Sequence, residues 1–496
     1  MKEREAKLVA PPGFDLPRLG GPEDAYVAEP QTARRLQTTY YDTADLRLAR
    51  WGASLRYRPG EGWTVKLPEG QAGALLVRAE HVFSGDGRRP PAEAVALVRP
   101  FVRTCRLSPV VRMRTLRHPV ELREPAGSRL AELADDEVQV LDGRRVVTRF
   151  RELEVELDEA ADDDLLEQVV ERLLEAGAEQ GEPTPKYLRA LGGRERTLGP
   201  EIVPPELDDW ATVEALLRQD LATSTLRLFR HEAGVRTGED PEAVHQARVA
   251  TRRLRSTLRT FSSLLEPEWT DRLRDELKWL ADLLGEVRDT DVLLERFSEH
   301  LAALPTADAR LGPRLLAGLV EQRDSARRRL LRAMGTKRYA VLLDDLVAAT
   351  AAPALLPGAD RPAAEVMPPL VVKPWKKLRK RVRKAGDDTP DEQLHQIRIR
   401  AKRARYAAEA VEPVIGEPAE DFADAVADLQ SVLGDHQDAV VGEAWLREAA
   451  GSARRDVALI AGELIGAERA SAAESRDRWR AVWKAASRRK LRAWLA

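Results

Sequence analysis

The feature that most constrains the fold is a basic motif that occurs twice. The stretches VHQARVATRRLRS and LHQIRIRAKRARY place His245 and His395 at equivalent positions, 395 − 245 = 150 residues apart. Gly285, in LGEVRDTDV, follows the first histidine by 285 − 245 = 40 residues, and Gly434, in LGDHQDAVV, follows the second by 434 − 395 = 39. Such a duplication predicts two similar lobes. We expect each lobe to hold a helical hairpin that begins with a basic helix and turns at its Gly-Asp segment, the two forming a pseudo-symmetric bundle.

The hydrophobic period changes along the chain and divides it into two parts. Short alternating runs such as ASLRYR, WTVKLP and RELEVELD dominate the first part and predict strands. Helical spacing then continues almost to the end. We therefore predict an α+β multidomain fold. Its parts are a β-rich antiparallel domain over 1–195, a linker over 196–207 and an all-α domain over 208–496, with pseudo-repeats at about 208–350 and 370–496.

Composition excludes several classes of protein. Residues are 43% hydrophobic and 33% charged, and no apolar run reaches the roughly 18 residues of a membrane span. The start MKEREAKLVA lacks the apolar core of a signal peptide. A single cysteine, Cys105, rules out an intramolecular disulfide and is typical of a reducing compartment. Because the net charge is −2, any anion site must come from the arrangement of charge rather than its amount.

Helical geometry places the basic residues of both motif copies on one face, within an arc of about 80°. In the first copy this face carries His245, Arg248, Arg252, Arg255 and Arg259. In the second copy it carries His395, Arg398, Lys402 and Arg405, with Glu409 at the position of Arg259. No acid lies between residues 245 and 259, so the repulsion between like charges is not relieved within the helix. The pattern favours an anionic ligand over the alternative of a solvated charged face.

The ligand suggested by this charge is a polymer of phosphates. A third basic cluster, KPWKKLRKRVRK, precedes the second copy, and arginine forks suit phosphate oxygens. Nucleic acid is the rival ligand, but binding of single strands relies on aromatic side chains that stack on bases. Tyr406 is the only aromatic residue in the two stripes. We therefore do not expect nucleic acid as a partner.

Charged side chains also alternate along the strands of the first part. Glu3, Glu5 and Lys7 share one strand face, and RELEVEL supplies a second acidic row. Cations that could point inward are Arg56, Arg58, Lys66, Arg112 and Arg114. Acids on one wall and cations on another suit metal-assisted phosphoryl chemistry, in which carboxylates bind Mg²⁺ or Mn²⁺. The alternative is an antiparallel sheet with polar outer faces.

The helical part resembles the CHAD domain, the conserved histidine α-helical domain, through both histidine helices and both Gly-Asp segments. The resemblance implies two pseudo-symmetric four-helix bundles that bind inorganic polyphosphate. The contacts that it implies in this chain are His245, Arg248, Arg252, Arg253, Arg255, Arg259, His395, Arg398, Lys402, Arg403 and Arg405, with Lys376, Lys377, Arg379, Lys380 and Arg383 as further candidates.

The first part resembles the CYTH domain of the triphosphate tunnel metalloenzyme superfamily. The matching pieces are the ExExK start, YYDTADLRLARWGASLRYR, WTVKLP, VRMR, LADDEVQV, ELEVEL and PKYLRAL. The resemblance implies an eight-stranded antiparallel tunnel that binds or hydrolyses triphosphates with Mg²⁺ or Mn²⁺. The catalytic residues that it implies are Glu3, Glu5, Lys7, Glu154 and Glu156, the four glutamates being metal ligands with Glu152 and Asp135 as helpers. The phosphate ligands that it implies are Lys7, Arg56, Arg58, Lys66, Arg112, Arg114 and Lys186.

Together these features predict a divalent-metal-dependent triphosphatase, with inorganic tripolyphosphate as substrate, fused to a domain that binds inorganic polyphosphate. One alternative is a non-catalytic protein that binds or targets polyphosphate. Another is an enzyme that hydrolyses or cyclises a nucleotide triphosphate, or hydrolyses thiamine triphosphate. We expect a cytoplasmic protein without membrane contact, with polyphosphate granules as a candidate location.

Overall fold

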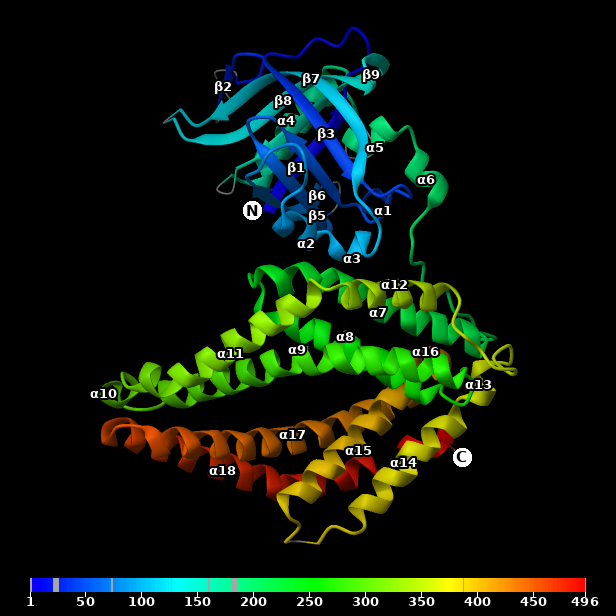
Figure 1. Ribbon diagram of the computed structural model, residues 1–496, viewed down its shortest axis with the longest axis vertical. Helices are drawn as coiled ribbons and strands as arrows, with labels where there is room; N and C mark the ends of the chain where they lie inside the picture. The colour runs from blue at the N-terminus through cyan, green and yellow to red at the C-terminus, as the bar shows by residue number, and fades with distance from the viewer. Residues whose placement is uncertain are drawn as a thin grey trace. The chain divides into compact units, whose positions relative to one another are not determined.

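The computed structural model describes residues 2–20, 26–72, 75–125, 127–158, 161–180, 186–386 and 388–495, with the backbone alone for residues 2–3, 69–72, 75–78 and 195–196. The chain forms two compact units, Met1–Glu201 and Ile202–Ala496 (Figure 1). The first contains all the strands and the second only helices, which confirms the predicted α+β class. No helix in the described ranges is long and apolar enough to span a bilayer.

The first unit is built on one antiparallel sheet. Its strands are β1 (Lys2–Val9), β2 (Val27–Pro30), β3 (Arg34–Asp42), β4 (Ser54–Arg58), β5 (Gly62–Ala72), β6 (Leu75–Phe83), β7 (Ser108–Arg123), β8 (Arg129–Asp142), β9 (Arg145–Leu157) and β10 (Glu179–Gln180). Among the described strands, eight follow the order β1-β6-β5-β4-β3-β7-β8-β9, and β1 pairs with β9 as well as β6. The circuit therefore closes into a tunnel. The short strand β2 pairs with β7, and the short strand β10 pairs with β1.

Apolar residues of the sheet pack on the outside of this tunnel as well as inside it. Leu8, Leu153 and Val155 pack beneath Val169 and Leu173 of helix α4 (Asp163–Glu175). Because side chains alternate along a strand, this burial turns the charged positions between them toward the interior. The outer apolar core is thus what forces a charged lining on the tunnel.

One end of the tunnel is closed by helix α5 (Lys186–Leu191). Tyr187 and Leu191 pack with Tyr40, Met113 and Val140 in one buried cluster, and the rings of Tyr187 and Tyr40 stack at 5.2 Å. This packing fixes the start of α5 against the charged interior. The remaining helices of the unit are α1 (Arg47–Arg50), α2 (Ala92–Leu97), α3 (Arg99–Val102) and α6 (Arg194–Leu198).

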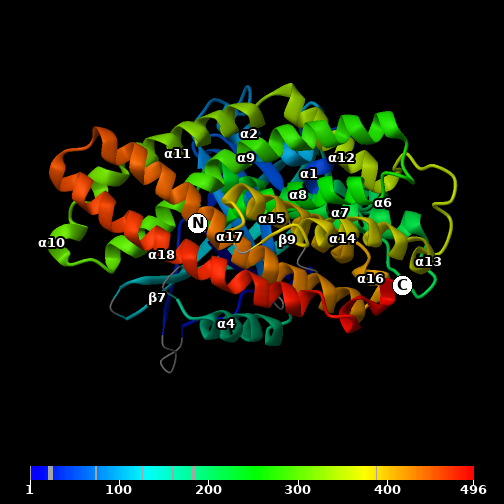
Figure 2. The ribbon, with the colours of Figure 1, turned by 90° about the horizontal axis from the view of Figure 1, so that it is seen from below.

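The second unit contains two lobes of related order. The first lobe comprises α7 (Val213–Thr237), α8 (Pro241–Thr260), α9 (Pro267–Ala302), α10 (Thr306–Ala309), α11 (Gly312–Met334) and α12 (Lys337–Ala351). After α13 (Ala363–Val366), the second comprises α14 (Pro368–Val382), α15 (Asp391–Glu409), α16 (Glu412–Ile415), α17 (Glu417–Ser452), α18 (Arg455–Ala486) and the 3₁₀ helix η1 (Lys490–Leu495). The two motif helices, α8 and α15, contact each other between the lobes (Figures 1 and 2).

The predicted turns at the two Gly-Asp segments are wrong. Gly285 and Gly434 lie inside the unbroken helices α9 and α17, and neither has a positive φ. Each glycine instead leaves room for an arginine from the motif helix. A Cβ atom at Gly285 would lie 3.8 Å from Arg248 Nη2, and one at Gly434 would lie 3.4 Å from Arg398 Nη2. Both are ordinary contact distances, so each glycine lies beside an arginine of a motif helix without being required by it, and the helical spacing continues through the glycines.

Candidate active site and polyanion-binding cleft

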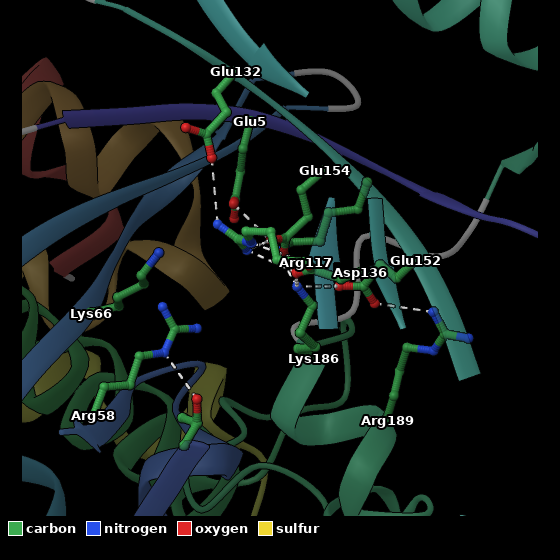
Figure 3. A network of polar contacts seen from close by, with 12 residues as sticks. Glu5, Arg58, Lys66, Arg117, Glu132, Asp136, Glu152, Glu154, Lys186 and Arg189 are labelled. Atoms are coloured by element: carbon green, nitrogen blue, oxygen red, sulfur yellow. Dashed lines mark hydrogen bonds and ion pairs between the residues drawn. The ribbon is translucent and has the colours of Figure 1, made fainter. Parts of the chain in front are cut away.

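The tunnel carries cations on one wall. Arg58 of β4 and Lys66 of the neighbouring β5 project inward (Figure 3), and Arg56 shares the strand face of Arg58. Arg58 Nε donates to Thr38 Oγ1 at 2.9 Å, and Lys66 Nζ lies 3.0 Å from Glu80 Oε2. Burial lowers the pKa of Arg58, and the neighbouring Arg56 lowers it further. Each of the three cations also has a carboxylate within 4 Å, from Glu80 or Glu61, so an anion bound at this wall would compete with these acids.

Acids occupy the facing wall. Glu5 of β1 is paired in register with Glu156 of β9. Partial desolvation raises the pKa of Glu156; Lys66 opposes this shift, while Glu5, Glu80 and Glu154 add to it by repulsion. The side chain of Glu3, a predicted metal ligand, lies outside the described part of the structure.

This donor set suits a divalent cation. Carboxylate oxygens are the ligands that Mg²⁺ and Mn²⁺ prefer, and a cation would relieve the repulsion among Glu5, Glu80 and Glu156. Within the described ranges, no three acidic, histidine or cysteine side chains are already grouped closely enough to hold a metal ion. The carboxylates of this wall are therefore of the type that would bind such an ion.

Glu154 is the centre of a buried ion-pair network rather than a member of that acidic group (Figure 3). Its carboxylate contacts Lys7, Arg117 Nη2 at 3.2 Å and Lys186 Nζ at 2.8 Å. Burial would raise the pKa of Glu154, but Lys186, Lys7 and Arg117 hold it well below its ordinary value. Its negative charge is thus already matched by three cations.

Lys186 enters this network from α5. Its ammonium group contacts Asp136, Glu154 and, at 3.4 Å, Glu152 Oε1. Glu152, a predicted helper, does point inward, and Arg189 Nη1 lies 3.0 Å from its Oε2. Lys186 could therefore bind phosphate only by releasing part of this acid group.

Two residues of β7 that were predicted to line the tunnel point outward. Arg112 and Arg114 are exposed, whereas their strand neighbours Met113 and Thr115 are 2% and 4% exposed. The inward cation of β7 is Arg117, which pairs with Asp136 and Glu154. The motif VRMR gave the correct strand but the wrong face, because both faces of β7 carry arginine.

Asp135 was likewise predicted on the wrong face of its strand. It pairs with Arg151 Nη2 at 2.6 Å outside the tunnel, and Asp136, which is fully buried, is the acid that points inward. A shift of one residue exchanges the two faces of a strand. Arg117 and Asp136 are thus the site residues that the sequence did not reveal, and continuing the alternation from Met113 would have found Arg117.

In the helical unit, the two motif helices line a shared cleft of about 460 Å³. Predicted residues that line it are His245, Arg248, Arg252, His395, Arg398 and Lys402. The structure adds Arg288 and two acids, Asp289 and Asp438, at matching positions of the repeat. Arg248 Nη1 pairs with Asp289 Oδ1 at 2.6 Å.

Lys402 lies among arginines in this cleft. Burial lowers its pKa to about 6, and Arg252, Arg398 and Arg248 add to the shift while Asp438 opposes it. Tyr406 lies beneath the same groups, with the guanidinium of Arg252 5.6 Å from its ring centroid. The cleft is therefore strongly positive before any ligand arrives.

The other predicted phosphate contacts lie elsewhere. Arg253 pairs with Asp220 at 2.9 Å and Arg405 with Glu409 at 2.5 Å, so both already have acidic partners. Arg255, Arg259 and Arg403 belong to a second arginine group with Arg274 and Arg400; burial and then Arg403 and Arg274 lower the pKa of Arg259 to about 10. The α14 candidates Lys376, Lys377, Arg379, Lys380 and Arg383 are not part of the cleft lining.

A closed tunnel with facing acidic and basic walls, and a duplicated helical unit with a basic cleft, define a protein class that joins a triphosphate tunnel to a conserved-histidine helical domain. The model of the CYTH domain matches residues 1–189, and that of the CHAD domain matches residues 219–447. The chain therefore belongs to the family of proteins in which a CYTH domain precedes a CHAD domain.

Similar proteins include two from Mycobacterium tuberculosis. "Uncharacterized protein Rv2226" from strain H37Rv and "Uncharacterized protein MT2285" from strain CDC 1551 are each 33% identical over 454 residues, which cover 84% of this chain and 83% of theirs. Among solved structures, PptA from Streptomyces chartreusis matches with a TM-score of 0.46 and 24% identity, over 55% of this chain and 100% of its own. The CHAD domain from the plant Ricinus communis matches with a TM-score of 0.46 and 29% identity, over 57% and 96%.

Proposed function

We propose that the tunnel hydrolyses a triphosphate with the help of Mg²⁺ or Mn²⁺, and that inorganic tripolyphosphate is its substrate. The observation that carries the proposal is the division of the lining into a cationic wall and an acidic wall within a closed sheet. Phosphoryl transfer depends on positioning and on neutralisation of the charge that develops on phosphate oxygens. Both are properties of such a lining.

The two walls take different parts in this reaction. Arg58 and Lys66, whose charged groups point into the same space (Figure 3), would bind phosphate oxygens, together with Arg56 on the same face of β4. Glu5 and Glu156, with Glu3 as an expected third, would hold the divalent cation. When bound, such a cation neutralises phosphate charge and lowers the pKa of a coordinated water.

The buried network serves the acidic wall. Lys7 lies 3.4 Å from Glu5 Oε2 and contacts Glu154, so it fixes the spacing between the two carboxylates. Lys186 and Arg117 hold the other edge of Glu154. We infer that this network positions the acidic wall, and that Lys186 and Arg117 contribute positive charge near the entering phosphates.

Release of phosphate from tripolyphosphate, with and without Mg²⁺ or Mn²⁺, tests the proposal. Glu156→Gln should reduce the metal-dependent rate by about 100-fold or more, the order expected for a lost metal ligand. Glu137→Gln, which changes an exposed outward-facing acid, is the matched control and should leave the rate unchanged. Metal-dependent turnover that is unaffected in Glu156→Gln would contradict the assignment. No turnover of any triphosphate in a panel with nucleotides and thiamine triphosphate would support the non-catalytic alternative.

We also propose that the helical cleft binds inorganic polyphosphate, which would place the protein in the cytoplasm and at polyphosphate granules. The cleft brings five cations and two histidines from both repeats around one space. It offers guanidinium and ammonium groups, its described lining contains no aromatic residue, and the nearby ring of Tyr406 lies against Arg252. Polyphosphate should therefore displace bound single-stranded RNA at stoichiometric amounts. Failure to compete would indicate nucleic acid as the ligand instead.

A further inference from the structure

A second basic pocket lies where the C-terminal 3₁₀ helix η1 packs against α14. It has a volume of about 380 Å³, and its charged lining comprises Lys376 and Arg379 from α14 with Arg489 and Arg492 from the C-terminal segment. We call it the C-terminal pocket. Figure 1 shows the segment at the C-terminus beside α14. We propose that the C-terminal pocket is a second binding site for oligophosphate anions, separate from the cleft; this rests on the proposed binding of polyphosphate.

The charge around this pocket has no internal compensation. The two segments that form it carry twelve basic residues, eight within 373–384 and four within 488–492, with no acid in either stretch, and four of the twelve line the pocket. Throughout the described ranges none of these twelve takes part in an ion pair, whereas many arginines elsewhere in the unit do. Like charges at this density repel one another. A bound polyanion would relieve that repulsion.

The pocket is a built concave site rather than a set of mobile surface side chains. Trp375 is 3% exposed, and its ring lies 5.3 Å from those of Phe422 and Trp483. Trp494 of η1 packs edge-on against Phe422 at 6.1 Å. This aromatic group fixes the backbone that carries Arg489 and Arg492 against α14.

One donor of the pocket is already desolvated. Arg492 Nε is buried and has no hydrogen-bond partner in the described part of the structure. A buried donor without a partner is unfavourable, and an anion in the pocket would supply the missing acceptor. The three arginine forks of the lining suit the paired oxygens of phosphate, and Lys376 adds a point charge.

The lining also limits the class of ligand. Apart from its cations the pocket is lined by Val372, Ala493, Leu495 and the buried Trp375, so no exposed ring is available for a base. This favours a phosphate chain without bases. The pocket shares no lining residue with the cleft, so short chains should occupy the two sites independently.

Calorimetric titration of the full chain with short polyphosphate tests the proposal through stoichiometry. The pocket variant is Arg379→Ala/Arg489→Ala/Arg492→Ala, and the cleft variant is Arg398→Ala/Lys402→Ala. The control is Arg310→Ala/Arg332→Ala/Lys337→Ala, which removes the same charge from exposed positions without ion pairs in the described ranges. The tunnel is unchanged in all four proteins and contributes equally to each, so the wild type and the control should bind one chain more than the pocket variant and one chain more than the cleft variant.

Salt dependence supplies a second readout. The quantity measured is the slope of log association constant against log salt concentration for the cleft variant. If the pocket makes three phosphate contacts, adding the pocket substitutions to the cleft variant should reduce the magnitude of this slope by about 2. A pocket variant with the same stoichiometry as the control, together with a cleft variant that binds one chain fewer, would overturn the second site and leave the proposed function intact. A wild type that binds no polyphosphate would overturn both. Loss of RNA binding alone in the pocket variant would also contradict the proposal.

Discussion

Raising the pH from about 6.5 to about 8.5 should weaken polyphosphate binding at the cleft, and Lys402 should cause most of the change. Burial and the nearby Arg252, Arg398 and Arg248 lower its pKa to about 6 in the ligand-free protein. Its ordinary value is about 10.4, and a bound polyanion should return the pKa toward that value. Between these two values, binding therefore takes up a proton.

The sign and size of the effect follow from this linkage. Below a pH of about 6, Lys402 is charged with and without ligand, and its contribution does not depend on pH. Above it, the free protein must first be protonated, so the association constant falls by up to tenfold for each pH unit. Over two units this amounts to at most about 100-fold, or about 2.7 kcal/mol.

The assay is titration with long-chain polyphosphate, whose internal phosphates stay ionised over this range. Calorimetry in buffers of different ionisation heat should show uptake of one proton near pH 8. Lys402→Met should bind more weakly at pH 6.5 and lose most of the pH dependence. His245→Gln is the comparison, because His245 is another titratable group of the cleft and burial lowers its pKa; this variant should keep the pH dependence of the wild type. A pH dependence that is equally steep in Lys402→Met would refute the reasoning.

Three further predictions concern single contacts. Asp289→Asn should strengthen polyphosphate binding about fivefold at low salt, because it frees Arg248 from an exposed ion pair worth up to about 1 kcal/mol; titration of the cleft measures this. Glu154→Gln should abolish metal-dependent phosphate release, leave polyphosphate binding intact and lower the melting temperature, because it leaves Lys186 and its neighbours short of a carboxylate. Gly285→Ala should stabilise the protein by about 0.5–1 kcal/mol in chemical denaturation without changing binding, since the added Cβ meets only ordinary contacts.

The sequence predicted the α+β fold class well and the direction of single side chains less well. Apolar residues alternate with a period of 2 in the first part of the chain and follow the helical period in the second. These two periods are easily distinguished over long segments, so strands and helices could be told apart. The repeat also identified the residues that meet in the cleft, since His245 and His395 occupy matching helix positions. These predictions depend on patterns averaged over many residues.

The errors arise where a sequence pattern is compatible with two structures. Alternation along β7 shows that Arg112 and Arg114 share a face, but only the packing of Met113 against Tyr40 decides that this face is the outer one. Likewise, a glycine within a leucine-rich helix can end it or accept a neighbouring side chain. At Gly434 the helix continues beside the guanidinium of Arg398, and that contact joins residues far apart in the sequence.

The two proposed anion sites use opposite electrostatic strategies. In the tunnel, Lys7, Arg117 and Lys186 converge on Glu154, so the ligand-free lining is largely neutralised and stable. In the cleft, Arg252 and Lys402 have no ion pair among the described residues, and burial lowers the pKa of each. Removing a tunnel partner should therefore destabilise the protein, whereas removing a cleft cation should stabilise it while weakening its ligand. A stability cost confined to the cleft is what a site selected for binding a polyanion would be expected to carry.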